Sequence, residues 1–240
     1  MKKTIFALLR PIAMIGCLIP LASYATAYSP ANFGNAVETL KKSVTLPSSF
    51  GEGVKTVAVY CQADVMTTGN INQVTCYENS PLVSMQAITE SALQSATFNP
   101  ASVDGNNVPV RMQFRVVYSL NNSQAPITLL ANLGTLQAQY GADYVAPQER
   151  LDQGSWYVQY STETRGTGKP FFADAKLTRV MATVEVNGGV ESVSTIEAAL
   201  RKQGEANDIQ AALKKSQFIP GFVANKPTAM HYIAVVNYKK

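Results

Sequence analysis

Two cysteines in the first half of the chain, Cys61 and Cys76, are the residues whose type and spacing most directly predict chemistry. Residues 57–61 alternate, turn-forming residues follow at 67–70, and the alternation resumes at 74–77, which is the pattern of a β-hairpin. A turn centred in the middle of 67–70 places Cys61 opposite Cys76, and opposed residues on antiparallel strands lie close to disulfide distance. We therefore predict a Cys61–Cys76 disulfide, with two buried free thiols as the alternative.

The same register pairs Met66 with Ile71 and Ala63 with Val74. In an oxidising compartment the disulfide would close a loop in the unfolded chain and stabilise the fold by roughly 2–4 kcal/mol. Other cysteine chemistry fits less well, because no histidine lies nearby for a zinc site and the spacing is too wide for a Cys-x-x-Cys redox pair.

The other reactive residue types do not form a catalytic pattern. His231, the single histidine, lies inside an expected strand, and nothing near it suggests the carboxylate and nucleophile of a Ser-His-Asp site. Residues 166–170 (G-T-G-K-P) lack the earlier glycine and the following Ser or Thr of a phosphate-binding loop, and no calcium loop is present. The sequence therefore predicts no enzyme, no metal and no cofactor. Carboxylate-only acid–base chemistry is the remaining enzyme hypothesis.

Charge argues against nucleic acid as a partner. The formal net charge is +4, but Lys2, Lys3 and Arg10 lie in the N-terminal leader, and without them 17 basic residues face 16 acidic ones. A nearly neutral surface without a basic stripe offers no electrostatic footprint for a phosphate backbone. The hydrophobic fraction of 46% is that of a globular protein rather than a disordered one.

Residues 1–27 have the pattern of a secretory signal peptide. Lys2-Lys3 supply positive charge, residues 12–22 are apolar, and residues 25–27 (A-T-A) form a small-x-small cleavage site. We predict that the mature chain begins at Tyr28 and that the protein is exported to a bacterial periplasm.

Two other interpretations of the leader remain open. Cys17 follows a poor lipoprotein box and could carry a lipid, and the leader could stay in place as an anchor. Arg10 and two prolines interrupt its apolar run, which is short for a membrane-spanning helix.

The elements around these residues form a unit that occurs twice. Phe98-Asn99-Pro100 recurs as Phe218-Ile219-Pro220, at about half the length of the chain. The alignment that we infer matches Pro109 with Pro227, Phe114 with Tyr232, and Val116-Val117 with Ala234-Val235, which removes two residues from the second loop. We predict an α+β fold with a first unit at 28–120, a linking region at 121–172 and a second unit at 173–240.

Each unit is expected to run strand, strand, helix, strand. A further short helix is expected within 30–43, with Asn35 as its cap. The expected elements of the first unit are strands at 54–66, 71–78 and 110–119 and a helix from Pro81 to about Ala96. Those of the second unit are strands at 177–186, 190–195 and 230–240 and helical segments at 196–203 and 208–216, separated by Gly204.

The linking region is too apolar to be a plain tether, so we expect it to pack on one or both units. Residues 127–140 are consistent with a short helix or with a pair of strands. Residues 156–160 are expected to form a strand, in which Trp156 packs in a core; an exposed aromatic patch is the alternative.

With these elements in place, each unit resembles the C-terminal periplasmic domain of TonB and the related TolA domain. The resemblance covers roughly 50–120 and 175–240. The shared features are a hairpin with a glycine turn (Gly69; Gly188-Gly189), a helix, Phe-x-Pro, a turn (Asp104-Gly105; Asn225-Lys226), a proline and a closing strand. It implies two TonB-like domains, each a three-stranded antiparallel sheet with one or two helices packed on one face.

The resemblance also implies a mode of binding, in which a partner's extended segment adds to the edge of the closing strand. The implied edge residues are Met112, Phe114 and Val116 in the first unit and Tyr232, Ala234 and Val236 in the second. An alternative is that the units dock edge to edge in one continuous sheet and hide both edges.

TonB itself has a membrane anchor with a functional histidine and a long Pro-rich spacer, whereas this leader has no histidine and residues 28–53 are few and not Pro-rich. We therefore predict a periplasmic adaptor that binds an envelope protein, such as an outer-membrane protein. The alternative is an anchored TonB-type energy transducer for outer-membrane transport.

Overall fold

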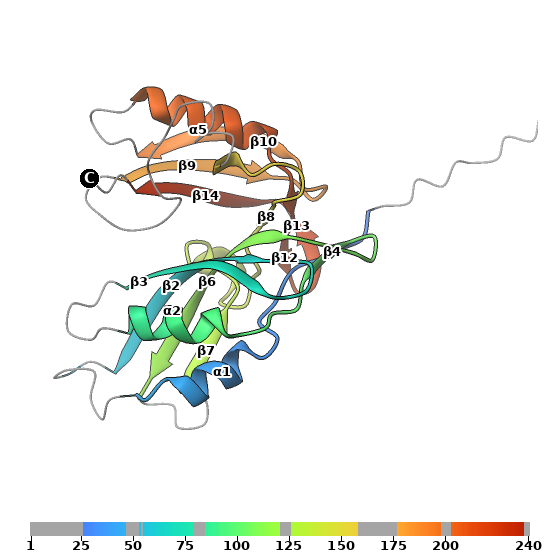
Figure 1. The fold of residues 1–240 in the computed structure, drawn as a ribbon. Helices are drawn as coiled ribbons and strands as arrows, with labels where there is room; N and C mark the ends of the chain where they lie inside the picture. Colours follow the sequence, from blue (N-terminus) through green and yellow to red (C-terminus); the bar gives the residue numbers. More distant parts are fainter. Residues whose placement is uncertain are drawn as a thin grey trace, which may run out of the picture.

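The computed structural model describes residues 26–46, 53, 55–78, 85–120, 126–157, 177–197 and 203–237 (Figure 1). It shows a mixed α+β fold with antiparallel strand pairing, as predicted. The leader up to residue 25, the loop at 166–170 and the start of the helix expected at Pro81 lie outside these residues. No helix among the described residues is long and apolar enough to span a membrane.

The first unit is built on a sheet in which β2 (Thr56–Val65) lies between β3 (Ile71–Glu78) and β6 (Val110–Ser119). Alternate residues of these strands are apolar and point to one face, since side chains alternate along a strand. Two helices, α1 (Ala36–Ser43) and α2 (Gln86–Gln94), pack on that face and complete the core. The fully buried side chains of β2 and β6 on this face are Val59, Cys61, Ala63, Val65, Val110, Met112, Phe114, Val116 and Tyr118.

The hairpin of β2 and β3 has the predicted pairing at the cysteines but not at the turn. Cys61 lies opposite Cys76, whereas Val65, and not Met66, pairs with Ile71. A bulge follows Asn72, where Gln73 has a φ of 55°, and the extra residue restores the register before the cysteines. The predicted Ala63–Val74 pair is lost at the same irregularity.

The second unit has a three-stranded sheet in the order β10 (Val190–Glu197), β9 (Leu177–Val184), β14 (Met230–Asn237). Helix α5 (Gln203–Lys215) packs on one face of it through Ile209, Ala212 and Leu213. The predicted helical segment at 196–203 is wrong at its start, because Ile196 and Glu197 belong to β10. Gly204 does not separate two helices but lies within α5.

Both units use the same backbone contact between their first hairpin and the chain after the helix. The Phe98 N–H donates to the Gly69 carbonyl at 2.8 Å, and the Phe218 N–H donates to the Gly188 carbonyl at 2.9 Å. Gly69 and Gly188 have φ values of 83° and 77°. A Cβ on either glycine would lie 2.0 or 2.1 Å from the carbonyl oxygen of that same phenylalanine. Glycine is therefore required at both turns, because φ is positive there and because no space remains for a Cβ atom.

The repeat differs in register from the predicted alignment. The hairpin β4 (Ala101–Val103) to β5 (Asn106–Val108) corresponds to β12 (Gly221–Val223) to β13 (Lys226–Thr228). Asp104 and Gly105 both have positive φ, as do Ala224 and Asn225, so the second turn lies one residue before the expected Asn225-Lys226.

No residues are therefore missing from the second loop. Pro109 corresponds to Ala229 and not to Pro227, and Phe114 corresponds to Ala234 and not to Tyr232. The shared proline misled the alignment because Pro227 lies inside β13, two residues before the position that follows the hairpin.

The linking region is part of the first unit's sheet. Strand β7 (Ile127–Leu130) pairs with the end of β6, and β8 (Gln148–Arg150) pairs with its start and with β11 (Phe218–Ile219) of the second unit. A short helix, α3 (Gln137–Tyr140), separates β7 from β8. The first sheet therefore has six strands instead of the predicted three.

Two local predictions in these segments need correction. Trp156 and Tyr157 are helical and not extended, while 158–160 lie outside the described residues. Trp156 is buried in the core of the second unit, as expected for a packed aromatic. Asn35 is at the N-cap position of α1 but makes no capping bond there, and its side chain accepts the N–H of Thr97 instead. The first described strand, β1 (Tyr28–Ser29), pairs with β4.

Substitution of the turn glycines should show that both units depend on the same contact. We expect Gly69→Ala and Gly188→Ala each to lower the free energy of unfolding by about 2 kcal/mol, from positive φ and the clash with a backbone carbonyl. Gly105→Ala is the matched control, because its φ is 80° but nothing lies within 4 Å of its Cβ. Urea unfolding of the three variants measures the difference, and equal losses at Gly69 and Gly105 would contradict the steric argument.

Candidate functional site

The closing strand of the first unit is not a free edge. β7 pairs with Arg115 to Tyr118 of β6, and β8 pairs with Val110 and Arg111. The prediction of an open edge is wrong for Val116, which has strand partners on both sides. Met112 and Phe114 lie between the two short pairings, and both side chains are buried in the core.

The closing strand of the second unit is different. Within the described residues β14 pairs only with β9, and the ladder from Met230 to Asn237 has no shift in register. The side chains of Tyr232 and Ala234 point into the core, and Val236 pairs with Thr178. At Tyr232 and Ala234 only the backbone of this strand could meet a guest, as strand addition requires.

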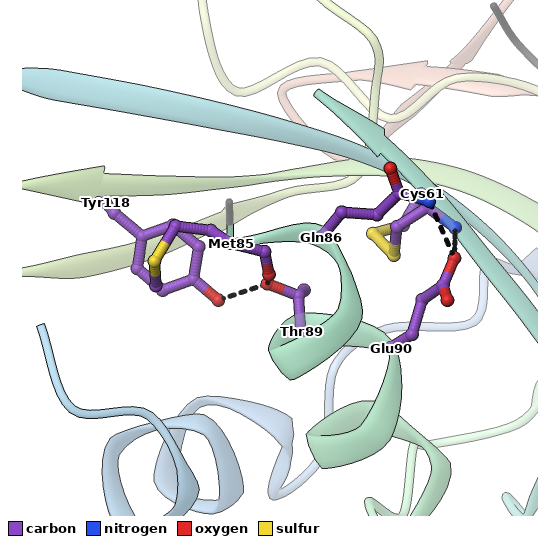
Figure 2. Close-up of a disulfide and its surroundings, with 7 residues drawn as sticks. Cys61, Met85, Gln86, Thr89, Glu90 and Tyr118 are labelled. Atoms are coloured by element: carbon purple, nitrogen blue, oxygen red, sulfur yellow. Dashed lines mark hydrogen bonds between the residues drawn. A yellow bond between two sulfur atoms is a disulfide. The ribbon is translucent and has the colours of Figure 1, made fainter. Parts of the chain in front are cut away.

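Two other outer strands, β3 of the first sheet and β10 of the second, carry protections against strand addition. β3 has the bulge at Gln73, and the Cys76 N–H donates to the Glu90 carboxylate of α2 at 2.5 Å (Figure 2). β10 has two irregularities, and Lys214 of α5 donates to the carbonyls of Val190 and Glu191. Bulges and charged side chains are devices by which proteins block exposed edges.

The β14 edge lies beside the first unit (Figure 1). Gln113 of β6 donates from Nε2 to the Ile233 carbonyl at 3.0 Å. In an antiparallel ladder backbone groups alternate between pointing toward and away from the partner strand, so those of His231, Ile233 and Val235 point away from β9. Residues of both units line a shallow depression at this place: Gln113, Leu133, Thr135, Tyr144, Ala146, His231, Tyr232 and Ile233.

Next to this depression is a buried ion pair that the sequence analysis did not identify. Arg111 of β6 donates from Nε and Nη2 to the two carboxylate oxygens of Asp64 in β2, at 2.8 and 3.0 Å. The Arg111 residue is only 4% exposed. Burial alone would lower the pKa of the guanidinium, but the hydrogen bond and charge of Asp64 outweigh it and raise that pKa.

A second carboxylate lies within reach of the same guanidinium. Glu149 of β8 is fully buried, and its Oε1 accepts the backbone N–H of Trp156 at 2.6 Å. Its Oε2 is 3.6 Å from Nη1 of Arg111, which is too long for a hydrogen bond, and has no hydrogen-bond partner among the described residues. Burial raises the pKa of Glu149 to about 7, although the charge of Arg111 opposes the shift.

The second unit contributes Tyr232 of β14 to this group. Its pKa is raised, first by burial and then by the negative charge of Glu149. Neither its phenol oxygen nor Nε1 of Trp156 has a hydrogen-bond partner in the described part of the chain. We call Asp64, Arg111, Glu149 and Tyr232 the junction cluster, because they come from the first unit, the linking region and the second unit.

Cys61 and Cys76 form the predicted disulfide, with their Cα atoms 4.1 Å apart (Figure 2). Both residues are buried under α2. Beside them Thr89 donates to the Met85 carbonyl at 2.6 Å and shares a 2.7 Å hydrogen bond with the phenol of Tyr118. This arrangement joins helix and sheet and indicates a structural disulfide rather than a reactive one.

His231 is exposed and lies 3.5 Å from the hydroxyl of Thr183. Among the residues that the structure describes, no group of three or more His, Cys, Asp or Glu side chains could hold a metal ion. In the described part of the chain, the junction cluster brings four ionisable side chains together and is closed to solvent. No family model, curated protein or solved structure matches the chain in the comparisons made.

Proposed function

We propose that the protein is an exported, non-enzymatic adaptor that binds an extended segment of an envelope protein by strand addition at β14. The observation that carries the proposal is the β14 edge. It is the long strand of the described chain that has a regular register, a partner on one side only, and neither a bulge nor a charged cap on the other side. Such an edge offers unpaired N–H and C=O groups to a guest.

The resemblance to TonB-like domains supports this proposal. Each unit has two paired strands, a helix, a short hairpin and a closing strand, in that order. In the family that each unit resembles, partners add to the closing strand. The first closing strand is occupied by β7 and β8, so the binding role falls to the second unit.

Export is the other half of the proposal. It is supported by the signal-like leader and by the Cys61–Cys76 disulfide, because disulfides persist mainly in oxidising compartments such as the periplasm. N-terminal sequencing tests it directly, since a mature start at Tyr28 excludes both the lipidated form and the anchored energy transducer.

The test of strand addition is a proline at an outward-facing, exposed position. We expect His231→Pro to abolish binding of the envelope partner, because the outward N–H is lost while the pairing of β14 with β9 is kept. His231→Ala is the matched control, since it removes the side chain but keeps that N–H. The measurement is photo-cross-linking from Ile233 in intact cells, with the cross-linked site on the partner mapped by mass spectrometry.

The expected pattern is a cross-linked segment in the wild type and in His231→Ala and none in His231→Pro, with the three proteins equally folded by circular dichroism. Equal cross-linking in His231→Pro would mean that the partner does not pair with this edge. Loss of cross-linking in His231→Ala would mean that the imidazole, and not the backbone, makes the contact.

A further inference from the structure

We propose that the junction cluster is a proton-controlled latch. With Glu149 protonated it holds β14 against the first unit, and ionisation of Glu149 loosens the contact and frees the β14 edge. This proposal rests on the proposed function for what the freed edge does, but the latch itself can be measured without a partner.

The position of the cluster connects it to the edge. Arg111 and Gln113 are two residues apart on β6 and therefore lie on the same face of that strand. Gln113 holds the outward carbonyl of Ile233, and the neighbouring residue Tyr232 belongs to the cluster. A change in the cluster therefore acts directly beside Ile233, the residue of β14 that Gln113 contacts.

The charges in the cluster do not balance when both carboxylates are ionised. The Arg111 guanidinium faces the carboxylates of Asp64 and Glu149. Asp64 already accepts the two short hydrogen bonds that this guanidinium donates. Arg111 donates from Nη1 to the Ser155 hydroxyl at 3.3 Å. The same Nη1 lies 3.6 Å from Oε2 of Glu149, which is too far for a hydrogen bond. An ionised Glu149 is thus a buried charge without full compensation, which is costly in a low-dielectric interior.

Protonation of Glu149 removes that cost. The charged or titratable groups that face Glu149 within the described chain are Arg111 from β6, Asp64 from β2 and Tyr232 from β14. Burial, which has the largest effect, and the charge of Asp64 favour the protonated form. The charge of Arg111 and hydrogen bonds from the Trp156 backbone and the Ser155 hydroxyl favour the ionised form. A protonated Glu149 leaves one carboxylate for one guanidinium, so that the charges in the cluster balance.

The direction of the pH effect follows from linkage. We call the form in which β14 is held against the first unit closed, and the form in which its edge is free open. In the closed form the pKa of Glu149 is about 7, against an ordinary 4.5, so the closed form binds the proton more tightly than the open form. The closed form is therefore most favoured below pH 4.5, and the advantage is lost as the pH rises toward 7. Over this window the ratio of closed to open molecules falls roughly a hundredfold.

Trp156 reports on the latch because it is the single tryptophan of the chain, is 1% exposed and donates its backbone N–H to Glu149. We expect acrylamide quenching of its fluorescence to be weak at pH 4.5, to rise up to about pH 7 and to be flat above it. Far-UV circular dichroism should stay constant over the range. Unchanged quenching from pH 4.5 to 8, or quenching that rises together with loss of secondary structure, would overturn the latch.

Two variants and a direct titration locate the proton. In the Glu149→Gln variant, acrylamide should quench Trp156 fluorescence equally at all pH values. In the Asp64→Asn variant, Arg111 is free to pair with Glu149, so the pH range over which the quenching changes should be narrower. In the wild type the ¹³C carboxyl resonance of Glu149 should titrate in the same window as the quenching, which keeps the test valid if a variant fails to fold. A pH-dependent Glu149→Gln, or a Glu149 resonance that titrates near 4.5, would contradict the latch.

The latch and the proposed function fail in different ways. Trp156 quenching that does not change with pH, together with cross-linking at Ile233, would support strand addition and contradict the latch. A pH-dependent curve without any cross-linked partner at pH 5 or pH 8 would keep the latch and remove the adaptor function. If both hold, cross-linking at Ile233 rises with pH over the window in which the quenching rises.

Discussion

Arg111→Met is expected to lower the free energy of unfolding by about 3–5 kcal/mol near neutral pH, because it leaves uncompensated carboxylates in the interior. Asp64 would lose both of its short hydrogen bonds, and Glu149 would lose the one positive charge within 4 Å in the described chain. The loss should be smaller at pH 5, where the stranded carboxylates can take up protons. Urea unfolding of the variant at pH 5 and pH 7.5 measures both effects.

Two controls separate the charge effect from the packing effect. Arg150→Ala removes an ion pair with Asp152 that lies at the surface, and it should cost less than about 1 kcal/mol. Replacing the three charges together (Asp64→Leu, Arg111→Met, Glu149→Leu) should restore most of the lost stability, because a well-packed apolar group often replaces a buried charge network without loss.

The same triple variant also tests the latch. It has no titrating group left in the cluster, so its Trp156 quenching should not change with pH. An Arg111→Met protein as stable as the wild type at pH 7.5 would show that the cluster is hydrated in solution, and the argument from buried charge would then be wrong.

Removal of the disulfide should give the second largest effect. Replacement of Cys61 and Cys76 by alanine is expected to lower the free energy of unfolding by about 3 kcal/mol, chiefly because the unfolded chain regains the freedom that a closed loop of this length removes. Both residues are buried under α2 and join β2 to the outer strand β3, so small packing losses add to this value. Urea unfolding with and without reductant measures the loss.

The control is the double-alanine variant itself, whose unfolding midpoint should not respond to reductant. The wild-type midpoint should fall on reduction to near that of the variant. A wild-type protein whose mass and midpoint are unchanged by reductant under denaturing conditions would show that the cysteines are free thiols.

Local features of the fold were predictable from local sequence. The hairpin around Gly69 and the pairing of Cys61 with Cys76 follow from strand alternation and turn residues that lie close together in the chain. The same holds for the second hairpin at Gly188 and for residues 208–215 of the helix before Phe218. In each case nearby residues decide the conformation, because they restrict φ or bury alternate side chains.

The bulge in the first hairpin and the position of the second turn were not predictable from the sequence. The bulge at Gln73 moved the turn pairing by one residue and yet kept the cysteines opposed. The true repeat register depends on a turn at Ala224-Asn225, a pair without glycine, whereas the more visible Pro227 suggested a shifted alignment. Positive φ at such residues is imposed by the strand pairing around them.

By itself the sequence determined an α+β chain with two units of the same element order and a cross-strand disulfide. Only the tertiary structure decided that β7 and β8 cover the first closing strand and that the second keeps an unpaired edge. Only it brought Glu149 to Arg111 and Asp64. The physical reason is that a hairpin is specified by neighbouring residues, whereas edge coverage and buried charge pairing depend on contacts between segments far apart in the chain.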